Sequence, residues 1–262
     1  STISAISLVL FSSHMSLSYN CSGAPITPHQ YGGTALFSLD KASHRVIDKG
    51  ADTTKLGRWS WTRYRGRNNQ TLRVIVGYRP NPPGGPFTVY AQHRTFFNSK
   101  GSDICPRLAF LQDLCSAINE FKETGDNIIL LLDGNTDMKS SDLQKALEFC
   151  QLREVILEKH GVHGPSTYRR NNTNTPIDGI WATPGIVIQE GGYFEYDSVF
   201  INMDHRCLWI DISFISAFGH IMPHIIKPSA RRLHCRDPRL VKNYVDRLGC
   251  GCKLPSPGLH KR

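Results

Sequence analysis

The chain has 262 residues, of which 40% are hydrophobic, and a formal net charge of +9. This size and apolar content allow one large domain, or one domain with tails. No apolar run reaches the roughly 18 residues that a membrane-spanning helix needs, so the sequence predicts no membrane partner. The first residue is Ser1 and no Lys or Arg precedes Lys41. We therefore interpret the chain as a fragment or processed product without a secretory signal.

Cysteine usage and charge distribution suggest where the protein works. The eight cysteines are scattered and form no C-x-x-C pair, which favours a reduced, intracellular compartment, with the nucleus as one candidate. Residues 227–262 hold ten basic and two acidic residues and so carry most of the excess charge. Such a basic tail can bind nucleic acid through phosphates, or can be a solvated linker to a further domain.

The first half of the chain reads as an irregular segment followed by strands and one long helix. Residues 1–30 are rich in serine and show no clear period, so we expect them to be irregular. Residues 33–39 and 71–78 are predicted strands, and the second ends at a Pro- and Gly-rich loop over 79–85. Apolar residues spaced by three and four predict a helix between Asp103, which can cap it, and Gly125, which can end it.

The second half alternates further strands with one helix. Residues 127–132 are entirely apolar after Asn127, which is typical of the centre of a buried sheet. A helix is predicted over 142–152, and strands over 177–183, 186–189 and 204–212. Mixed strands and helices in one compact region predict a layered α/β protein.

Residues 55–67 are dense in arginine and tryptophan. Basic and aromatic side chains mixed in this way can hold phosphates and stack on bases. The alternative, which the pattern alone favours, is an exposed strand whose tryptophans pack inward. The candidate nucleic-acid-binding residues are Arg58, Arg63, Arg65 and Arg67.

Asp133, Gly134 and Asn135 follow the predicted buried strand, where loops often place functional side chains. A carboxylate beside an amide can orient a water and hold a phosphate oxygen. A calcium loop of the EF-hand type is excluded, because Met138 and Gln144 occupy the positions that need Gly and Glu. A plain turn is the remaining alternative.

Asp204 and His205 precede another apolar strand, and Asp178 lies at the start of a third. A protonated imidazole can stabilise negative charge on a phosphate, and a carboxylate bonded to that imidazole raises its pKa. Tyr78 ends its strand before the Pro-rich loop, where a phenol could donate to a phosphate oxygen, or could simply pack against the strand.

Taken in order, Tyr78-Arg79-Pro80-Asn81, Asp133-Gly134-Asn135, Ser166-Thr167-Tyr168, Asp178-Gly179 and Asp204-His205 resemble the endonuclease/exonuclease/phosphatase family. The resemblance covers about residues 31–213 and is greatest to the apurinic-endonuclease-like domains of non-LTR retrotransposons. It implies a four-layered α/β sandwich of the DNase I type. The implied chemistry is hydrolysis of phosphodiester bonds in DNA with Mg²⁺ or Mn²⁺.

The resemblance also implies roles for particular residues. Asp133 would orient the attacking water, with Asn135 beside it, and Asp204 would lie near the metal. His205 would contact the phosphate while paired with Asp178, and Tyr78 would bind the phosphate too. The basic segment over 230–248 resembles the connector that leads to a reverse transcriptase in such elements.

The sequence departs from the family at its start. The family begins with a strand that bears an Asn and a strand that ends in a metal-binding Glu, but no Glu precedes Glu120 here. Residues 1–30 do not resemble those strands, so we predict a sandwich that lacks its first two strands. Because ligand charge sets affinity for a hard cation, metal binding should be weakened.

The sequence therefore predicts three parts: an irregular segment over 1–30, a catalytic-type domain over 31–215 and a basic connector over 216–262. The main functional hypothesis is a metal-dependent endonuclease domain of a retroelement, impaired by loss of the Glu. A non-catalytic nucleic-acid-binding remnant is the first alternative. A phosphatase of the same fold that acts on phosphoinositides or sphingolipids is the second.

Overall fold

The computed structural model describes residues 13–22, 32–161, 164–169, 175–196 and 204–220, with isolated positions after 238. Compact packing separates one unit, Ser1–Met222, from a second, Pro223–Arg262. The predicted boundaries at 31, 215 and 262 remain predictions, and most of the proposed connector over 230–248 lies outside the described residues. Within those residues, no helix is both long enough and apolar enough to cross a bilayer.

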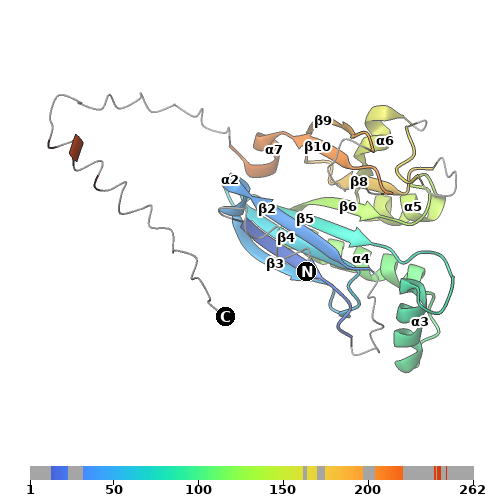
Figure 1. Ribbon diagram of the computed structural model, residues 1–262. Helices are drawn as coiled ribbons and strands as arrows, with labels where there is room; N and C mark the ends of the chain where they lie inside the picture. The colour runs from blue at the N-terminus through green and yellow to red at the C-terminus, as the bar shows by residue number, and fades with distance from the viewer. Residues whose placement is uncertain are drawn as a thin grey trace, which may run out of the picture. The chain divides into compact units, whose positions relative to one another are not determined.

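A six-stranded mixed sheet forms the centre of the first unit (Figure 1). Its strand order is β3-β4-β5-β6-β8-β7, in which β5 and β6 are parallel and the other neighbours are antiparallel. The bounds are β3 Val46–Ala51, β4 Trp59–Arg65, β5 Thr71–Tyr78, β6 Asp126–Asp133, β7 Arg153–Glu154 and β8 Asp178–Ala182.

Helices cover one face of this sheet. The helix predicted between Asp103 and Gly125 is α4 (Pro106–Glu123), and the helix predicted over 142–152 is α5 (Ser141–Phe149). Their apolar stripes pack on β4, β5 and β6 to form the main core. Two further helices, which the sequence did not predict, lie elsewhere: α3 (Val89–Ser99) packs on α4, and α6 (Val155–His160) packs against β8 and β9.

Two separate strand pairs lie on the opposite face. One pairs β1 (Ser13–Ser18) with β2 (Thr34–Leu39), and the other pairs β9 (Ile188–Tyr193) with β10 (Leu208–Ile212). The short helices are α2 (Asp40–Ser43) and α7 (Phe214–Phe218). A second core of apolar side chains fills the space between the β9–β10 pair, α6, α7 and the sheet. The predicted α/β sandwich is thus confirmed, and the arrangement is the DNase I-like fold.

The prediction that residues 1–30 are irregular is wrong for β1. Alternation of serine with Met15 and Leu17 gives β1 a period of two, and Ser16 and Ser18 face inward. Ser16 has a polar partner there, because its Oγ donates to the carbonyl oxygen of Gly50. Because these inward positions are polar, the hydrophobic pattern of a strand is inverted and was missed.

Candidate active site

Three polar side chains stand in one row across the middle of the central sheet. Tyr78 ends β5, Asp133 ends β6, and Asp178 begins β8. The register places Tyr78 beside Asp133, and Asp133 beside Asp178. β5 and β6 run parallel and β8 runs antiparallel to them. The C-terminal ends of β5 and β6 therefore lie beside the N-terminal end of β8. Residues about 100 positions apart in the chain are thereby brought to neighbouring strands.

Asp133 lies between the other two members of the row and is half-buried. Burial, followed by the negative charge of Asp178, raises its pKa to about 7. Its Oδ1 accepts a hydrogen bond from the backbone N–H of Asn135 at 3.1 Å. A carboxyl group with a pKa near neutrality can exchange a proton with a water at physiological pH.

His205 closes the cluster from the segment before β10. Its Nδ1 lies 2.9 Å from Oδ2 and 3.2 Å from Oδ1 of Asp178. This hydrogen bond to Asp178 is the main cause of a raised pKa for His205, against a smaller opposing effect of burial. The ring also packs on Tyr168, with ring centroids 5.0 Å apart. The imidazolium form is therefore favoured at the position next to the two carboxylates.

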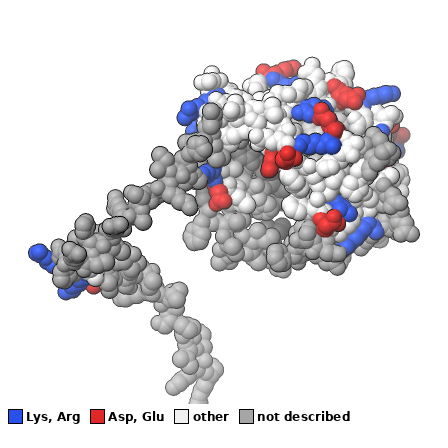
Figure 2. All heavy atoms as spheres, turned by 90° about the horizontal axis from the view of Figure 1, so that it is seen from above, with Lys and Arg blue, Asp and Glu red and all other residues white. Residues whose placement is uncertain are grey.

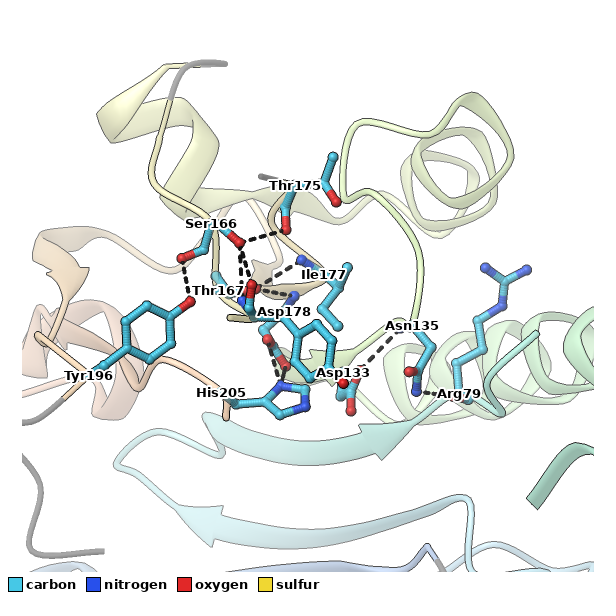
Figure 3. A network of polar contacts seen from close by, with 11 residues as sticks. Arg79, Asp133, Asn135, Ser166, Thr167, Thr175, Ile177, Asp178, Tyr196 and His205 are labelled. Atoms are coloured by element: carbon cyan, nitrogen blue, oxygen red, sulfur yellow. Dashed lines mark hydrogen bonds and ion pairs between the residues drawn. The ribbon is translucent and has the colours of Figure 1, made fainter. Parts of the chain in front are cut away.

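A buried threonine fixes the start of β8. Thr167 is fully buried, and its Oγ1 accepts hydrogen bonds from the backbone N–H groups of Ile177 at 2.9 Å and Asp178 at 3.0 Å. Ser166 ties the same loop to the carbonyl oxygen of Thr175, and Tyr196 donates to the carbonyl oxygen of Ser166 (Figure 3). These contacts hold the backbone of Asp178 in place and so orient its carboxylate toward His205.

Asn135 and two arginines border the row on the other side. Asn135 adopts a left-handed backbone with φ 45°, and its Nδ2 donates to the carbonyl oxygen of Arg79 at 2.8 Å (Figure 3). Arg107 donates to the carbonyl oxygens of Asn135 and Pro80. Burial, with the charge of Arg107, lowers the pKa of Arg79 to about 10, which still leaves it cationic at neutral pH. Positive charge is therefore held next to the acidic cluster.

The cluster has the donor atoms of a divalent-cation site. One ligand atom from each of Asp133, Asp178 and His205 lies within 4.8 Å of the others. Carboxylate oxygens are the donors that a hard cation prefers, and the crowding that raises the pKa of Asp133 is what a cation would relieve. The residues therefore fit such a cation. Asp204 is not in this group, and its predicted place near the metal remains a prediction.

Arg58 does not have the predicted nucleic-acid-binding role. Its side chain is fully buried, and its guanidinium pairs with Asp52 at 2.7 Å and with Asp113 at 2.8 Å. Arg63 is similarly engaged, because its Nε lies 2.8 Å from Oδ1 of Asp126. The alternation of Arg and Trp in this stretch is thus that of a strand that buries Trp59 and pairs Arg63 with a carboxylate, preceded by the buried Arg58.

Arg65 and Arg67 are exposed but lie far from the acidic cluster. The register places Arg65 beside Thr71, seven residues along β5 from Tyr78. At about 3.3 Å per residue this is roughly 23 Å from the row of polar side chains. In the face shown in Figure 2, the acidic and basic side chains of the described residues are interleaved. Any role of Arg65 and Arg67 would therefore be remote from the cluster.

Sequence reasoning assigned no role to Thr167, Arg79 or Arg107. Thr167 stands in the Ser-Thr-Tyr motif that was noted only for its order. Its contribution depends on a buried hydroxyl that bonds two backbone groups ten and eleven residues away. Arg107 lies on the first turn of α4, and nothing in its local pattern indicates that it reaches the loop after β6.

The sequence matches no protein-family model and no curated protein. Solved structures share its fold at low sequence identity. The human Nocturnin catalytic domain, with a bound sulfate anion, has a TM-score of 0.55 at 15% identity. The match covers 81% of this chain and 76% of the Nocturnin chain. The 3′ phosphatase NExo from Neisseria, bound to a product DNA hairpin, has a TM-score of 0.55 at 15% identity. The match covers 80% of this chain and 82% of NExo. An endonuclease/exonuclease/phosphatase family protein from Bacteroides thetaiotaomicron has a TM-score of 0.50 at 14% identity. The match covers 84% of this chain and 80% of that protein.

Proposed function

We propose that this chain belongs to the endonuclease/exonuclease/phosphatase family and hydrolyses phosphodiester bonds with a divalent cation. The observation that carries the proposal is the row formed by Tyr78, Asp133 and Asp178, with His205 paired to the last of these. Acid, base and phenol groups that lie together at the ends of neighbouring strands are the groups that phosphoryl chemistry needs. The fold supports the proposal but does not choose among substrates.

The geometry supports a division of labour within the cluster. Asp133, with its pKa near neutrality, accepts a proton from a water that attacks phosphorus. His205, held protonated by Asp178, donates a hydrogen bond to an oxygen that gains charge. The Tyr78 hydroxyl, whose pKa is raised by burial and by Asp133, stays protonated and donates to another phosphate oxygen. A cation held against the carboxylates of this cluster would supply further neutralisation of phosphate charge.

DNA is the substrate class that we favour. The Tyr78-Arg79-Pro80 loop resembles the DNA-cleaving branch of the family more than its lipid phosphatases. A retroelement origin, with a downstream reverse transcriptase as partner, rests on the order of the five motifs and on the basic segment over 230–248. NExo, which shares the fold, was solved with a DNA product.

Nicking of supercoiled plasmid by the purified full chain tests this proposal. Relaxed circles should form with Mg²⁺ or Mn²⁺ and should not form when EDTA is present. The His205→Gln variant should lose at least about a hundredfold in rate, the range expected when one charge-stabilising group is removed. A folded wild-type protein that never nicks DNA with either cation would refute the nuclease assignment.

A second candidate function is nucleic-acid binding without turnover. It is favoured by the small number of carboxylates in the cluster, Asp133 and Asp178, and by the basic composition of residues 227–262. Binding of this kind would weaken steeply as salt rises, because it depends on release of phosphate counterions. DNA affinity that falls with salt, together with no cleavage, would select this alternative.

A further inference from the structure

Two thiols meet between α4 and α5, outside the acidic cluster. Cys115 lies on α4, and Cys150 is the C-cap residue of α5. The Sγ atom of Cys115 lies 3.5 Å from the carbonyl oxygen of Ala146 on α5, and the Sγ atom of Cys150 lies 3.9 Å from the carbonyl oxygen of Cys115. The two thiols also hydrogen-bond to each other. Each sulfur is therefore in contact with the other helix.

The packing of the two helices fixes this contact. The backbone N–H of Cys150 bonds to the same Ala146 carbonyl oxygen that the Cys115 sulfur approaches, at 3.4 Å. Lys122 stands two turns after Cys115 on α4, and its Nζ donates to the carbonyl oxygen of Cys150 at 2.9 Å. One face of α4 thus holds the last turn of α5 at two points. Both helices, and the strand β6 between them, lie wholly within the described residues.

The geometry suits a covalent bond between the two sulfur atoms. Sulfur atoms in contact lie about 4 Å apart, whereas a disulfide needs about 2.05 Å, so the side chains have to close only roughly 2 Å. Rotation about the two Cα–Cβ bonds can supply most of this approach. Residues 115 and 150 belong to separate helices, so the bond would link two elements that now touch only by packing and hydrogen bonds.

The two thiols differ in reactivity and in access. The pKa of Cys150 is lowered, mainly because the Cys115 thiol donates a hydrogen bond to its sulfur and further by the charge of Lys122, against an opposing effect of burial. The same hydrogen bond and burial raise the pKa of Cys115. Cys150 is 0% exposed, whereas Cys115 is half-exposed. Cys150 is thus the sulfur that ionises, and Cys115 is the one that faces the surface.

We propose that Cys115 and Cys150 form a redox-active dithiol, which hydrogen peroxide oxidises to a disulfide between α4 and α5. The thiolate sulfur of Cys150 attacks one peroxide oxygen, the O–O bond breaks, and Cys150 becomes a sulfenic acid. The hydroxide that leaves takes up the proton that Cys150 had given up. The Cys115 sulfur then attacks the Cys150 sulfur, the S–O bond breaks, and water leaves with the Cys115 proton. Two thiols and one peroxide thus give one disulfide and two waters.

The disulfide would act as a clamp on the part of the chain that carries Asp133. The segment from 115 to 150 contains β6 and the loop after it, so the bond would close a loop around both. α5 already supports that loop, because Gln144 Nε2 donates to the carbonyl oxygen of the buried Met138 at 2.6 Å. A covalent link restricts the unfolded chain and so favours the folded state. The oxidised protein should consequently be the more stable form.

Peptide mapping after mild oxidation tests the pairing. The full chain is reduced, freed of reductant and treated with hydrogen peroxide, and the remaining thiols are blocked with N-ethylmaleimide before digestion with trypsin. The peptides that span 108–122 and 146–153 should appear as one linked species, which dithiothreitol separates. The midpoint of thermal unfolding should be higher after oxidation by roughly 5–10 °C. A linked species without this rise would overturn the clamp.

Two matched variants separate this pair from general cysteine oxidation. Cys115→Ala should abolish the linked peptides and the rise in midpoint, and it should leave a Cys150 sulfenic acid that dimedone traps. Cys105→Ala removes an exposed cysteine just before α4 and should leave both results unchanged. Absence of the linked peptides in the wild-type protein, at a peroxide concentration that oxidises Cys105, would overturn the proposal. Disulfides that join Cys115 or Cys150 to any other cysteine, or to a second chain, would overturn it too.

Discussion

His205 and Asp178 form a hydrogen-bonded pair, with Nδ1 of the imidazole 2.9 Å from Oδ2 of the carboxylate. The two residues come from segments 27 positions apart and meet because Tyr168 forms a bridge with His205 while Thr167 holds the backbone of Asp178. The pair links the charge state of the imidazole to the carboxylate row on β6 and β8.

Replacing Asp178 with Asn should lower the pKa of His205. The Asp178 hydrogen bond is the main cause of the raised pKa, and an amide keeps the shape but removes the charge. Titration of the imidazole proton signals by NMR measures the change directly. Equal His205 pKa values in the wild-type protein and Asp178→Asn would show that the pair does not control protonation.

The same pair should make stability depend on pH. A histidine whose folded pKa is raised contributes stability that is complete below its unfolded pKa of about 6.5 and is lost as pH rises through the folded value. The free energy of unfolding should therefore differ most between wild-type and Asp178→Asn at about pH 6. Urea unfolding across a pH series should show that the difference in the free energy of unfolding between the two proteins becomes smaller at alkaline pH. A gap that widens with pH would contradict the assignment.

Asp133→Asn should stabilise the protein at alkaline pH. Burial and Asp178 raise the pKa of Asp133 from 3.8 to about 7, so the folded state disfavours the charged form. Stability is consequently lost as pH rises from about 4 to 7, and the amide avoids this loss. We expect a gain of up to about 4 kcal/mol in the free energy of unfolding at pH 8 without divalent cations, and little difference at pH 4. A variant less stable than wild-type at pH 8 would disprove the reasoning.

Thr167→Val should disturb the pair without touching it. Valine matches threonine in shape but cannot accept the N–H groups of Ile177 and Asp178. Two partly buried donors left without partners should cost about 2 kcal/mol in the free energy of unfolding and should lower the His205 pKa. Thr167→Ser keeps the hydroxyl and serves as the control. If Thr167→Val destabilises the protein no more than Thr167→Ser, the two hydrogen bonds are not what the site depends on.

Replacing the buried Arg58 should destabilise the protein strongly, whereas replacing the exposed Arg65 and Arg67 should not. Arg58→Ala leaves Asp52 buried without its partner and should cost about 3–5 kcal/mol in the free energy of unfolding. The double variant Arg65→Ala, Arg67→Ala should change stability by less than about 0.5 kcal/mol, because both side chains are exposed. Thermal unfolding distinguishes the two. Destabilisation of similar size in both variants would mean that the buried network is not what Arg58 supports.

The sequence predicted the parts of the fold whose pattern is local. The helix that became α4 has apolar residues at helical spacing, and β6 is a continuous apolar run. It could not predict β1, because the inward positions of that strand are serines that bond to other strands rather than to a core. It also misjudged Arg58, because the partners that bury this residue, Asp52 and Asp113, lie on other segments.

Some residues of the candidate site could be predicted from local sequence patterns, and others could not. Tyr78, Asp133, Asp178 and His205 were singled out because each stands at an end of an apolar or β-branched run, and the structure brings them together. Thr167 and Arg107 act through contacts with backbone atoms of distant loops, which leave no local pattern.

Single-turnover cleavage of a short fluorescent DNA duplex, with Mn²⁺ and with EDTA, tests the central claim most directly. The wild-type protein should cleave only with the cation. Asp133→Asn and His205→Gln should each be slower by at least about a hundredfold. Asp48→Asn, at an exposed acid on β3, should cleave like the wild-type protein. Cleavage that survives in both cluster variants, or no cleavage by folded wild-type protein, would contradict the assignment of the row at Tyr78, Asp133 and Asp178 as a phosphodiesterase site.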